Sequence, residues 1–168
     1  MSFIISGTTV RSFADYQDVV DRDQRLFESN EGLTDTVIED ALIRASERIL
    51  TRIGSSNWWK DYQFKRDANL KNDIRLIPPV NPARIKARQA DFTDLCVYLA
   101  LAEYILPKIA DFSNLDSAEV QKIKYYEDKT EKMLTELIEA GDFYDFAGDG
   151  TVNTSDKAPS RLNLMRVR

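Results

Sequence analysis

The chain has 168 residues, of which 43% are hydrophobic and 30% charged, and this composition predicts a single soluble globular domain. It contains no histidine and only one cysteine, which excludes an internal disulfide, the usual zinc sites and Ser–His or Cys–His catalysis. No apolar run reaches the ~18 residues of a membrane span, so no membrane partner is expected, and the N-terminus lacks the basic region of a secretory signal.

The net charge of −5 is distributed unevenly along the chain. Residues 60–88 hold eight Lys and Arg against three Asp, and residues 151–168 hold four basic residues against one acidic residue. The rest of the chain therefore carries a net charge of −13. An acidic body with two basic segments favours association between copies or binding to an acidic partner.

Two helices are predicted in the first third of the chain. Residues 1–11 are expected to form a short strand or an extended arm, followed by a helix over residues 12–28 with Ser12 as its N-cap. The clearest helix runs from Thr36 to Gly54, because its apolar residues fall on one stripe. We expect a capping box at its start and a left-handed glycine cap at its end.

The insert that follows, residues 55–80, lacks a clean helical period. Aromatic residues alternate with charged residues after Trp58 and Trp59, and we interpret the segment as a β-hairpin or a long ordered loop. Pro78 and Pro79 close the insert, because neither can lie inside a helix.

Two more helices are predicted downstream. Residues 81–107 are apolar nearly all round from Leu95 to Ala102, which places this helix at the centre of the bundle. Cys96 within it is expected to be a buried, unreactive thiol. The last helix spans residues 116–141, and the alternating residues 151–168 suit a strand added to another protein's sheet edge.

Together these elements predict an all-α fold. About four helices form one small bundle domain over residues 1–150, with the insert at residues 55–80 between the second and third helices. Residues 151–168 form an extended C-terminal arm.

No catalytic, cofactor-binding or metal-binding residues are predicted. The acidic residues after the last helix do not match a calcium loop, because Thr154 and Ser160 stand where glycine and glutamate are required. The run from Lys60 to Arg66 mixes aromatic and basic side chains, as proteins that bind single-stranded nucleic acid do. The alternative for this run is a loop that packs Trp58 and Phe64 onto the bundle.

Residues 12–145 resemble the head–tail connector (adaptor) proteins of tailed bacteriophages, of the Mu-like or lambdoid type. The order and spacing of four stretches carry the resemblance: Leu33-Thr34-Asp35 leading into residues 37–49, a proline-bearing loop, residues 91–101, and Tyr125-Tyr126-Glu127 in a helix ending at Gly141.

The resemblance implies a virion structural protein, made in the host cytoplasm and located at the head–tail interface. Such proteins are not enzymes. They form a ring, typically of twelve copies, which docks on the portal, extends the DNA channel without binding DNA specifically, and holds a tail or stopper protein below.

The resemblance also assigns contact residues. It implies a portal-docking arm at Arg161, Leu162, Leu164, Met165 and Arg166. It implies contacts with a neighbouring subunit or ring from the insert, at Trp58, Trp59, Lys60, Phe64, Lys65 and Arg66.

Two other functions stay open. The first is a helical nucleic-acid-binding or regulatory protein that uses residues 60–88 and binds DNA in a salt-dependent manner. The second is an enzyme with carboxylate or lysine chemistry, which would require a pocket holding a carboxylate of raised pKa.

Overall fold

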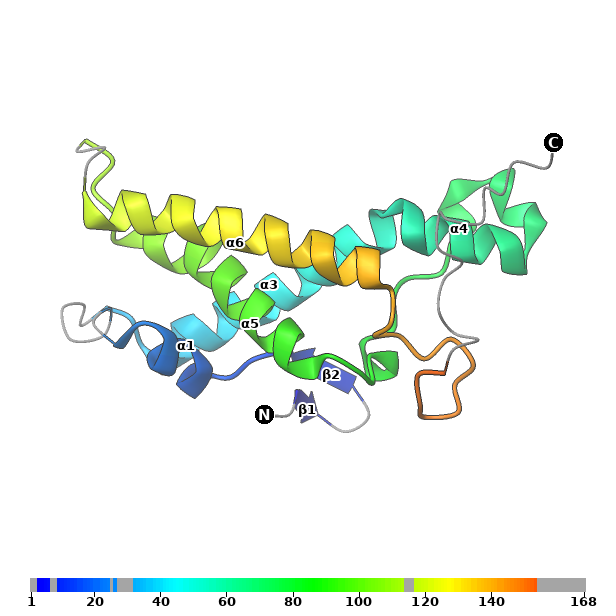
Figure 1. The fold of residues 1–168 in the computed structure, drawn as a ribbon. Helices are drawn as coiled ribbons and strands as arrows, with labels where there is room; N and C mark the ends of the chain where they lie inside the picture. Colours follow the sequence, from blue (N-terminus) through cyan, green and yellow to red (C-terminus); the bar gives the residue numbers. More distant parts are fainter. Residues whose placement is uncertain (1–2, 7–8, 25, 27–31, 114–116, 154–168) are drawn as a thin grey trace.

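The computed structural model describes residues 3–6, 9–24, 26, 32–113 and 117–153 (Figure 1). The predicted all-α class is confirmed. The α-helices are α1 (Tyr16–Arg22), α3 (Asp35–Ser55), α4 (Asn57–Arg66), α5 (Gln89–Ala100) and α6 (Ala118–Ala140). An N-terminal hairpin pairs strands β1 (Ile4–Ser6) and β2 (Thr9–Ser12) in antiparallel fashion. No helix in the described part of the chain is long and apolar enough to cross a membrane.

Helix α5 forms the centre of the core, as its apolar run predicts. It packs against α3 on one side and α6 on another, with α1 also in contact (Figure 1). Leu99 is only 2% exposed, and Cys96 is fully buried. A π-turn (Leu101–Ile105) and a 3-10 turn containing Pro107 (Leu106–Lys108) continue α5 before the chain turns back. The prediction that this helix ends near Pro107 is therefore confirmed.

The start of the third predicted helix lies later in the chain than expected. Asn81 does act as a cap, but of a short 3-10 turn (Pro82–Arg84), where its side chain accepts a hydrogen bond from the Ala83 amide. The amides of Lys86 and Ala87 then donate to the Phe143 carbonyl, so they are not available to a helix. Consequently α5 begins only at Gln89.

The predicted caps of the first two helices were wrong. Helix α1 is capped by Asp15 in a capping box with Asp18, whereas Ser12 belongs to β2. Helix α3 begins at Asp35 without a side-chain cap. Gly54 lies within α3 and does not have the positive φ of a left-handed cap.

The β-hairpin interpretation of the insert was also wrong, because the insert contains helix α4. The Ser56 hydroxyl caps α4 by accepting a hydrogen bond from the Trp59 amide. The buried residues Trp59 and Gln63 are four positions apart and share one helix face. The apparent alternation of aromatic and charged residues is therefore part of a helical period. Two 3-10 turns follow α4 (Ala68–Lys71 and Ile74–Leu76).

A buried polar cluster fixes the end of the hairpin to α3 and α5. The Ser46 hydroxyl accepts a hydrogen bond from the Phe13 amide at 3.0 Å and lies 3.3 Å from the Cys96 sulfur. The Thr93 hydroxyl donates to the Phe13 carbonyl at 2.8 Å. These hydrogen bonds satisfy polar groups that would otherwise be costly to bury.

The segment after α6 folds back beside the start of α5. Gly141 ends α6 with a φ of 59°, which confirms its predicted role. Ile85 and Tyr144 then form an antiparallel bridge, and the Asp145 amide donates to the Arg84 carbonyl at 2.9 Å. This pairing brings residues 142–146 under α4.

Candidate interaction surfaces

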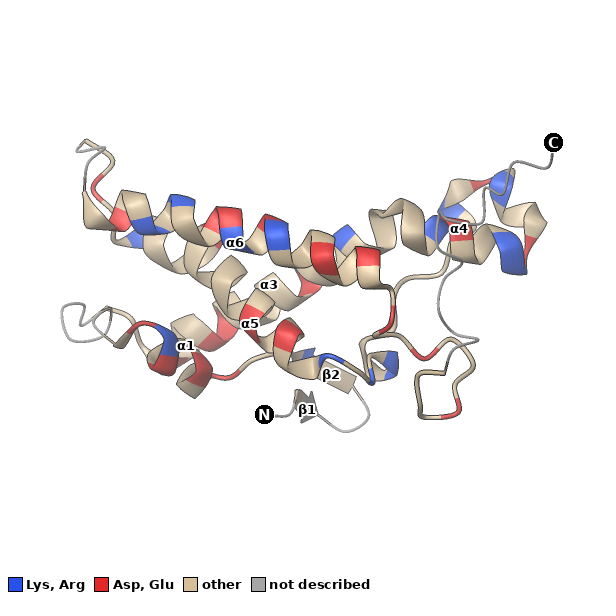
Figure 2. Cartoon of the chain, viewed as in Figure 1, with Lys and Arg blue, Asp and Glu red and all other residues tan. Residues whose placement is uncertain are grey.

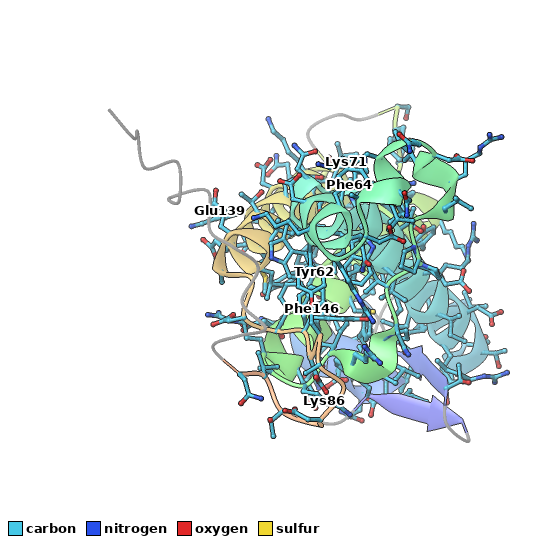
Figure 3. The ribbon with its side chains drawn as sticks, turned by 90° about the vertical axis from the view of Figure 1, so that its right-hand side faces the viewer. Tyr62, Phe64, Lys71, Lys86, Glu139 and Phe146 are labelled. Atoms are coloured by element: carbon cyan, nitrogen blue, oxygen red, sulfur yellow. The ribbon has the colours of Figure 1, made fainter. Side chains whose placement is uncertain are left out.

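An aromatic cluster anchors α4 to the body of the protein. The ring centroids of Trp58 and Phe143 lie 4.9 Å apart, and those of Trp59 and Tyr144 lie 5.1 Å apart. Phe146 stacks against Tyr62 with a centroid distance of 3.5 Å, and Figure 3 shows the two labelled side chains one above the other. Burial of these rings fixes the position of α4 relative to residues 142–146.

Two of the predicted contact residues, Trp58 and Trp59, belong to this aromatic cluster. Trp59 is only 2% exposed, and its indole donates to the Pro78 carbonyl at 2.9 Å. Trp58 packs between Phe143 and Phe146. The two tryptophans therefore take part in packing within the chain, which is the alternative that the sequence left open for Trp58.

Two basic side chains of α4 are exposed in the described part of the chain. Lys65 and Arg66 are exposed, whereas Lys60 and Phe64 are half-buried. We call α4 and the two 3-10 turns after it the α4 lobe, residues 57–76. In Figure 1 this lobe extends beyond the end of α6, and Figure 2 shows several Lys and Arg on it.

The two 3-10 turns of the α4 lobe expose apolar and basic side chains. Ile74 and Leu76 are 62% and 64% exposed, which is unusual for large apolar residues in the described part of the chain. Lys71, at the end of the preceding 3-10 turn, is exposed and forms no ion pair with any described residue. Exposed apolar side chains next to unpaired basic ones make these turns a candidate contact surface.

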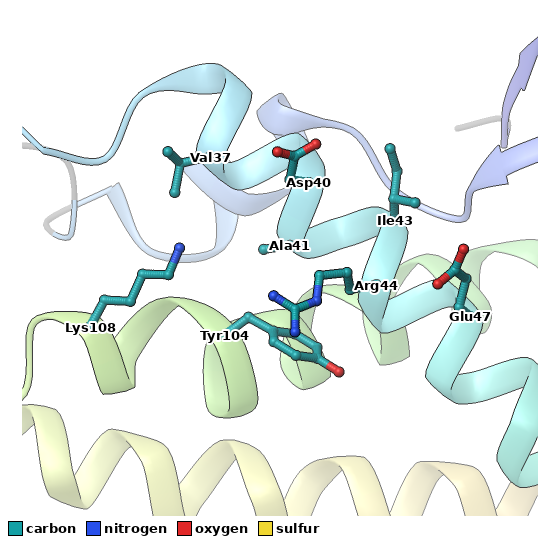
Figure 4. Close-up of a pocket in the computed structure, with 8 residues that line it drawn as sticks. All are labelled: Val37, Asp40, Ala41, Ile43, Arg44, Glu47, Tyr104 and Lys108. Atoms are coloured by element: carbon teal, nitrogen blue, oxygen red, sulfur yellow. The ribbon is translucent and has the colours of Figure 1, made fainter.

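A groove follows the outer face of α3. Three adjoining hollows of about 360, 410 and 560 Å³ share Asp40, Ile43, Glu47 and Leu50 between them. Figure 4 shows the first hollow, where the Arg44 guanidinium lies over the Tyr104 ring at 4.8 Å from its centroid. Burial, together with the neighbouring Glu103, raises the pKa of Tyr104, so its hydroxyl stays neutral.

The body of the protein carries carboxylates that remain without a cationic partner. Asp23 is paired with Lys122 at 2.6 Å, and Glu131 is paired with Arg52. By contrast, the exposed α6 residues Glu127, Asp128 and Glu139 form no ion pair within the described residues. These acidic side chains on α6 are therefore accessible to other molecules.

The acidic segment after α6 uses its carboxylates to build turns. The buried carboxylate of Asp145 accepts hydrogen bonds from the amides of Gly148 and Gly150. Burial alone would raise the pKa of Asp145, but these amides and that of Asp149 lower it below its usual value. The described residues contain no group of three acidic or cysteine side chains arranged to hold a metal.

Cys96 shows no sign of a reactive thiol. Its burial raises the pKa of the thiol to about 11, although hydrogen bonds from Ser46 and Ser12 oppose the shift. The thiolate is the reactive form, and it is therefore scarce at neutral pH.

The comparisons with known proteins identify no relative: no family model, curated protein or solved structure matches this chain. The residues of the predicted docking arm, Arg161 to Arg166, lie outside the described residues. Gln63, Arg84 and Tyr144, which meet beneath α4, were not among the predicted site residues. No local sequence pattern marks them, because the pairing of residues 84–88 with 142–146 brings them together.

Proposed function

We propose that this protein is a structural, non-enzymatic component of a phage virion that forms a ring at the head–tail connection. The observation that carries the proposal is the α4 lobe, a basic extension with exposed Ile74 and Leu76 on a body that is otherwise acidic. The resemblance of residues 12–145 to head–tail connectors supports the same function.

The physical basis is the geometry of a ring. A closed ring of identical subunits requires a head-to-tail contact between two different surfaces of the same chain. The α4 lobe supplies a basic and apolar surface, while α6 and the groove along α3 supply surfaces with unpaired carboxylates and half-buried apolar residues. Opposite charge on the two surfaces would orient the encounter and disfavour contacts between like surfaces.

In this proposal the ring docks on a portal and extends its channel toward the tail. The acidic body suits a channel through which DNA slides, because few cationic side chains would hold the phosphates. The arm at residues 161–166 is proposed to contribute to docking.

The proposal is tested by adding the purified protein to portal-bearing particles that lack it. We expect the protein to co-sediment with the particles in a fixed stoichiometry above one copy per portal. A chain ending at Gly150 should keep its helical circular dichroism and lose this docking. Failure of the full-length protein to bind the particles would refute the proposed function.

A nucleic-acid-binding function is the second candidate. It is favoured by Lys65, Arg66 and Lys71, which are exposed and have no ion-pair partner among the described residues. This function predicts that the logarithm of the DNA affinity falls linearly with the logarithm of the salt concentration. Salt-dependent DNA binding without binding to particles would favour this candidate over the connector.

A further inference from the structure

A small hollow beneath α4 collects hydrogen-bond donors from three segments of the chain. Its volume is about 200 Å³, and it lies between α4, residues 78–84 and residues 144–146. The rings of Trp59 and Phe146 contribute its apolar part. Pockets for whole small molecules usually have volumes of about 300–1,000 Å³, so this hollow suits a single side chain better than a cofactor.

The charged residues that line the hollow are both cationic, although one of them, Arg84, also interacts with the Asp145 carboxylate nearby. Arg66 and Arg84 both line it, and no carboxylate does. Arg66 forms no ion pair with any residue that the structure describes. One guanidinium nitrogen of Arg84, Nη1, donates a hydrogen bond to the Phe146 carbonyl at 3.3 Å. The N–H groups on the other two guanidinium nitrogens do not take part in this hydrogen bond. An anion that entered the hollow could accept hydrogen bonds from both guanidinium groups.

The third donor is the side-chain amide of Gln63 on α4, which lines the hollow. Gln63 is only 5% exposed as a residue, but its amide atoms are not among the fully buried polar atoms without a partner in the described part of the protein. The amide therefore faces the hollow, where its nitrogen can donate a hydrogen bond to an incoming group.

A fourth donor is the Tyr144 hydroxyl. Its oxygen accepts a hydrogen bond from the Asn81 amide at 3.3 Å, which leaves its proton free to donate. Burial raises the pKa of Tyr144, so the hydroxyl keeps this proton at neutral pH.

We propose that this hollow receives the carboxylate of an Asp or Glu side chain from a second copy of the chain. The proposal rests on the proposed ring function, for which it supplies a specific contact. Charge complementarity selects the donor, because α6 exposes Glu127, Asp128 and Glu139 without ion-pair partners. Charged hydrogen bonds from two guanidinium groups to one carboxylate are among the strongest polar contacts in proteins.

The first experiment tests the hollow itself. The melting temperature of the full-length protein is followed while acetate replaces chloride at constant ionic strength. We expect acetate to raise the melting temperature of the wild type and to have no effect on Arg66→Ala. Lys65→Ala, at an exposed neighbour that does not line the hollow, should respond like the wild type. Equal acetate responses in all three proteins would overturn the proposed site.

The second experiment tests the partner by measuring self-association with light scattering. Arg66→Glu should weaken association at least 10-fold, whereas Lys65→Glu, the same change of charge outside the hollow, should weaken it less than 3-fold. Gln63→Leu should also weaken association, yet it should leave the melting temperature near that of the wild type, because it removes no hydrogen bond between described residues. That combination of effects would not follow from a role of Gln63 in stability alone.

The outcomes separate this inference from the proposed function. Assembly of Arg66→Glu and Gln63→Leu on portal-bearing particles with the wild-type stoichiometry and affinity would overturn the inference and leave the connector function standing. A wild-type protein that stays monomeric, both alone and on particles, would overturn both, whatever its response to acetate.

The donor can be identified by cross-linking. Arg66→Lys places an amine at the hollow, and a carbodiimide couples amines to adjacent carboxylates. We expect an intermolecular cross-link between the lysine introduced at position 66 and an Asp or Glu of α6. Cross-links that form only within one chain would contradict a donor from a second copy.

Discussion

Replacing Gly141 with alanine tests how the end of α6 is fitted against α4. Gly141 has a φ of 59°, and a Cβ atom built there would lie 2.6 Å from Trp58 Nε1. A left-handed conformation costs an alanine about 1–2 kcal/mol, and overpacking costs about 1–3 kcal/mol. The Trp58 ring cannot easily move aside, because it packs against Phe143 and Phe146.

We therefore expect Gly141→Ala to lower the free energy of unfolding by about 3 kcal/mol. In a chain of this length, that loss corresponds to a fall in melting temperature of about 6–12 °C. Thermal unfolding followed by circular dichroism measures the loss, and tryptophan fluorescence reports the displacement of Trp58.

Two other glycines serve as controls. Gly150 also has a positive φ, 91°, but nothing lies within 4 Å of its added Cβ, so Gly150→Ala should show the backbone cost alone. Gly54 lies inside α3 with only an ordinary contact at 3.6 Å, so Gly54→Ala should stabilise the protein by about 0.5–1 kcal/mol. A Gly141→Ala variant no less stable than Gly150→Ala would refute the packing of Gly141 against Trp58.

Three further predictions concern buried groups. The carboxylate of Asp145 has a lowered pKa in the folded state, so it stabilises the folded protein above about pH 4, and this stabilisation is lost as the pH falls further. The difference in unfolding free energy between the wild type and Asp145→Asn should therefore be largest near pH 7 and should shrink in acid. Cys96 should not react with a thiol reagent at pH 8 in the native protein, but should react fully in denaturant, because burial raises the pKa of its thiol to about 11; rapid labelling of the native protein would contradict its burial. Phe146→Ala should cost about 3–5 kcal/mol in chemical denaturation and change the tryptophan fluorescence, since Phe146 contacts both tryptophans and Tyr62; an unchanged denaturation midpoint would show that the cluster does not anchor α4.

The sequence predicts those parts of the fold that depend on local patterns. The uninterrupted apolar residues from Leu95 to Ala102 identify α5 as the central helix, and the structure buries them accordingly. Gly141 ends α6 as expected, because a glycine directly after an amphipathic helix is a strong local signal.

The parts that the sequence does not predict depend on distant contacts. Gly54 has the same sequence context as a helix cap, yet α3 continues through it to Ser55. Asn81-Pro82 is a typical helix start, but the pairing of residues 84–88 with 142–146 uses the amides that a helix would need. Helix α4 is stabilised by the aromatic residues that follow α6, and its own residues give only a weak helical pattern.

The candidate site also combines residues that a local pattern predicts with residues that only distant contacts bring together. The sequence indicates a basic insert, and the structure places Lys65 and Arg66 on its exposed side. Arg84 and Tyr144, which line the hollow together with Arg66, come close to it only after the chain folds back on α4. Sequence patterns alone could not distinguish Arg66, for which we propose a contact role, from Trp59, which packs in the core.

The most direct test of the central claim is the mass of the protein in solution, measured by light scattering over a range of concentrations. If the protein is a ring-forming connector, it should form an oligomer of one defined mass, which the resemblance puts near twelve copies, and this oligomer should dissociate as the salt concentration rises. If the chain assembles only on a portal, an oligomer of the same mass should be found on the particles. A stable monomer or dimer that ignores portal-bearing particles would contradict the account.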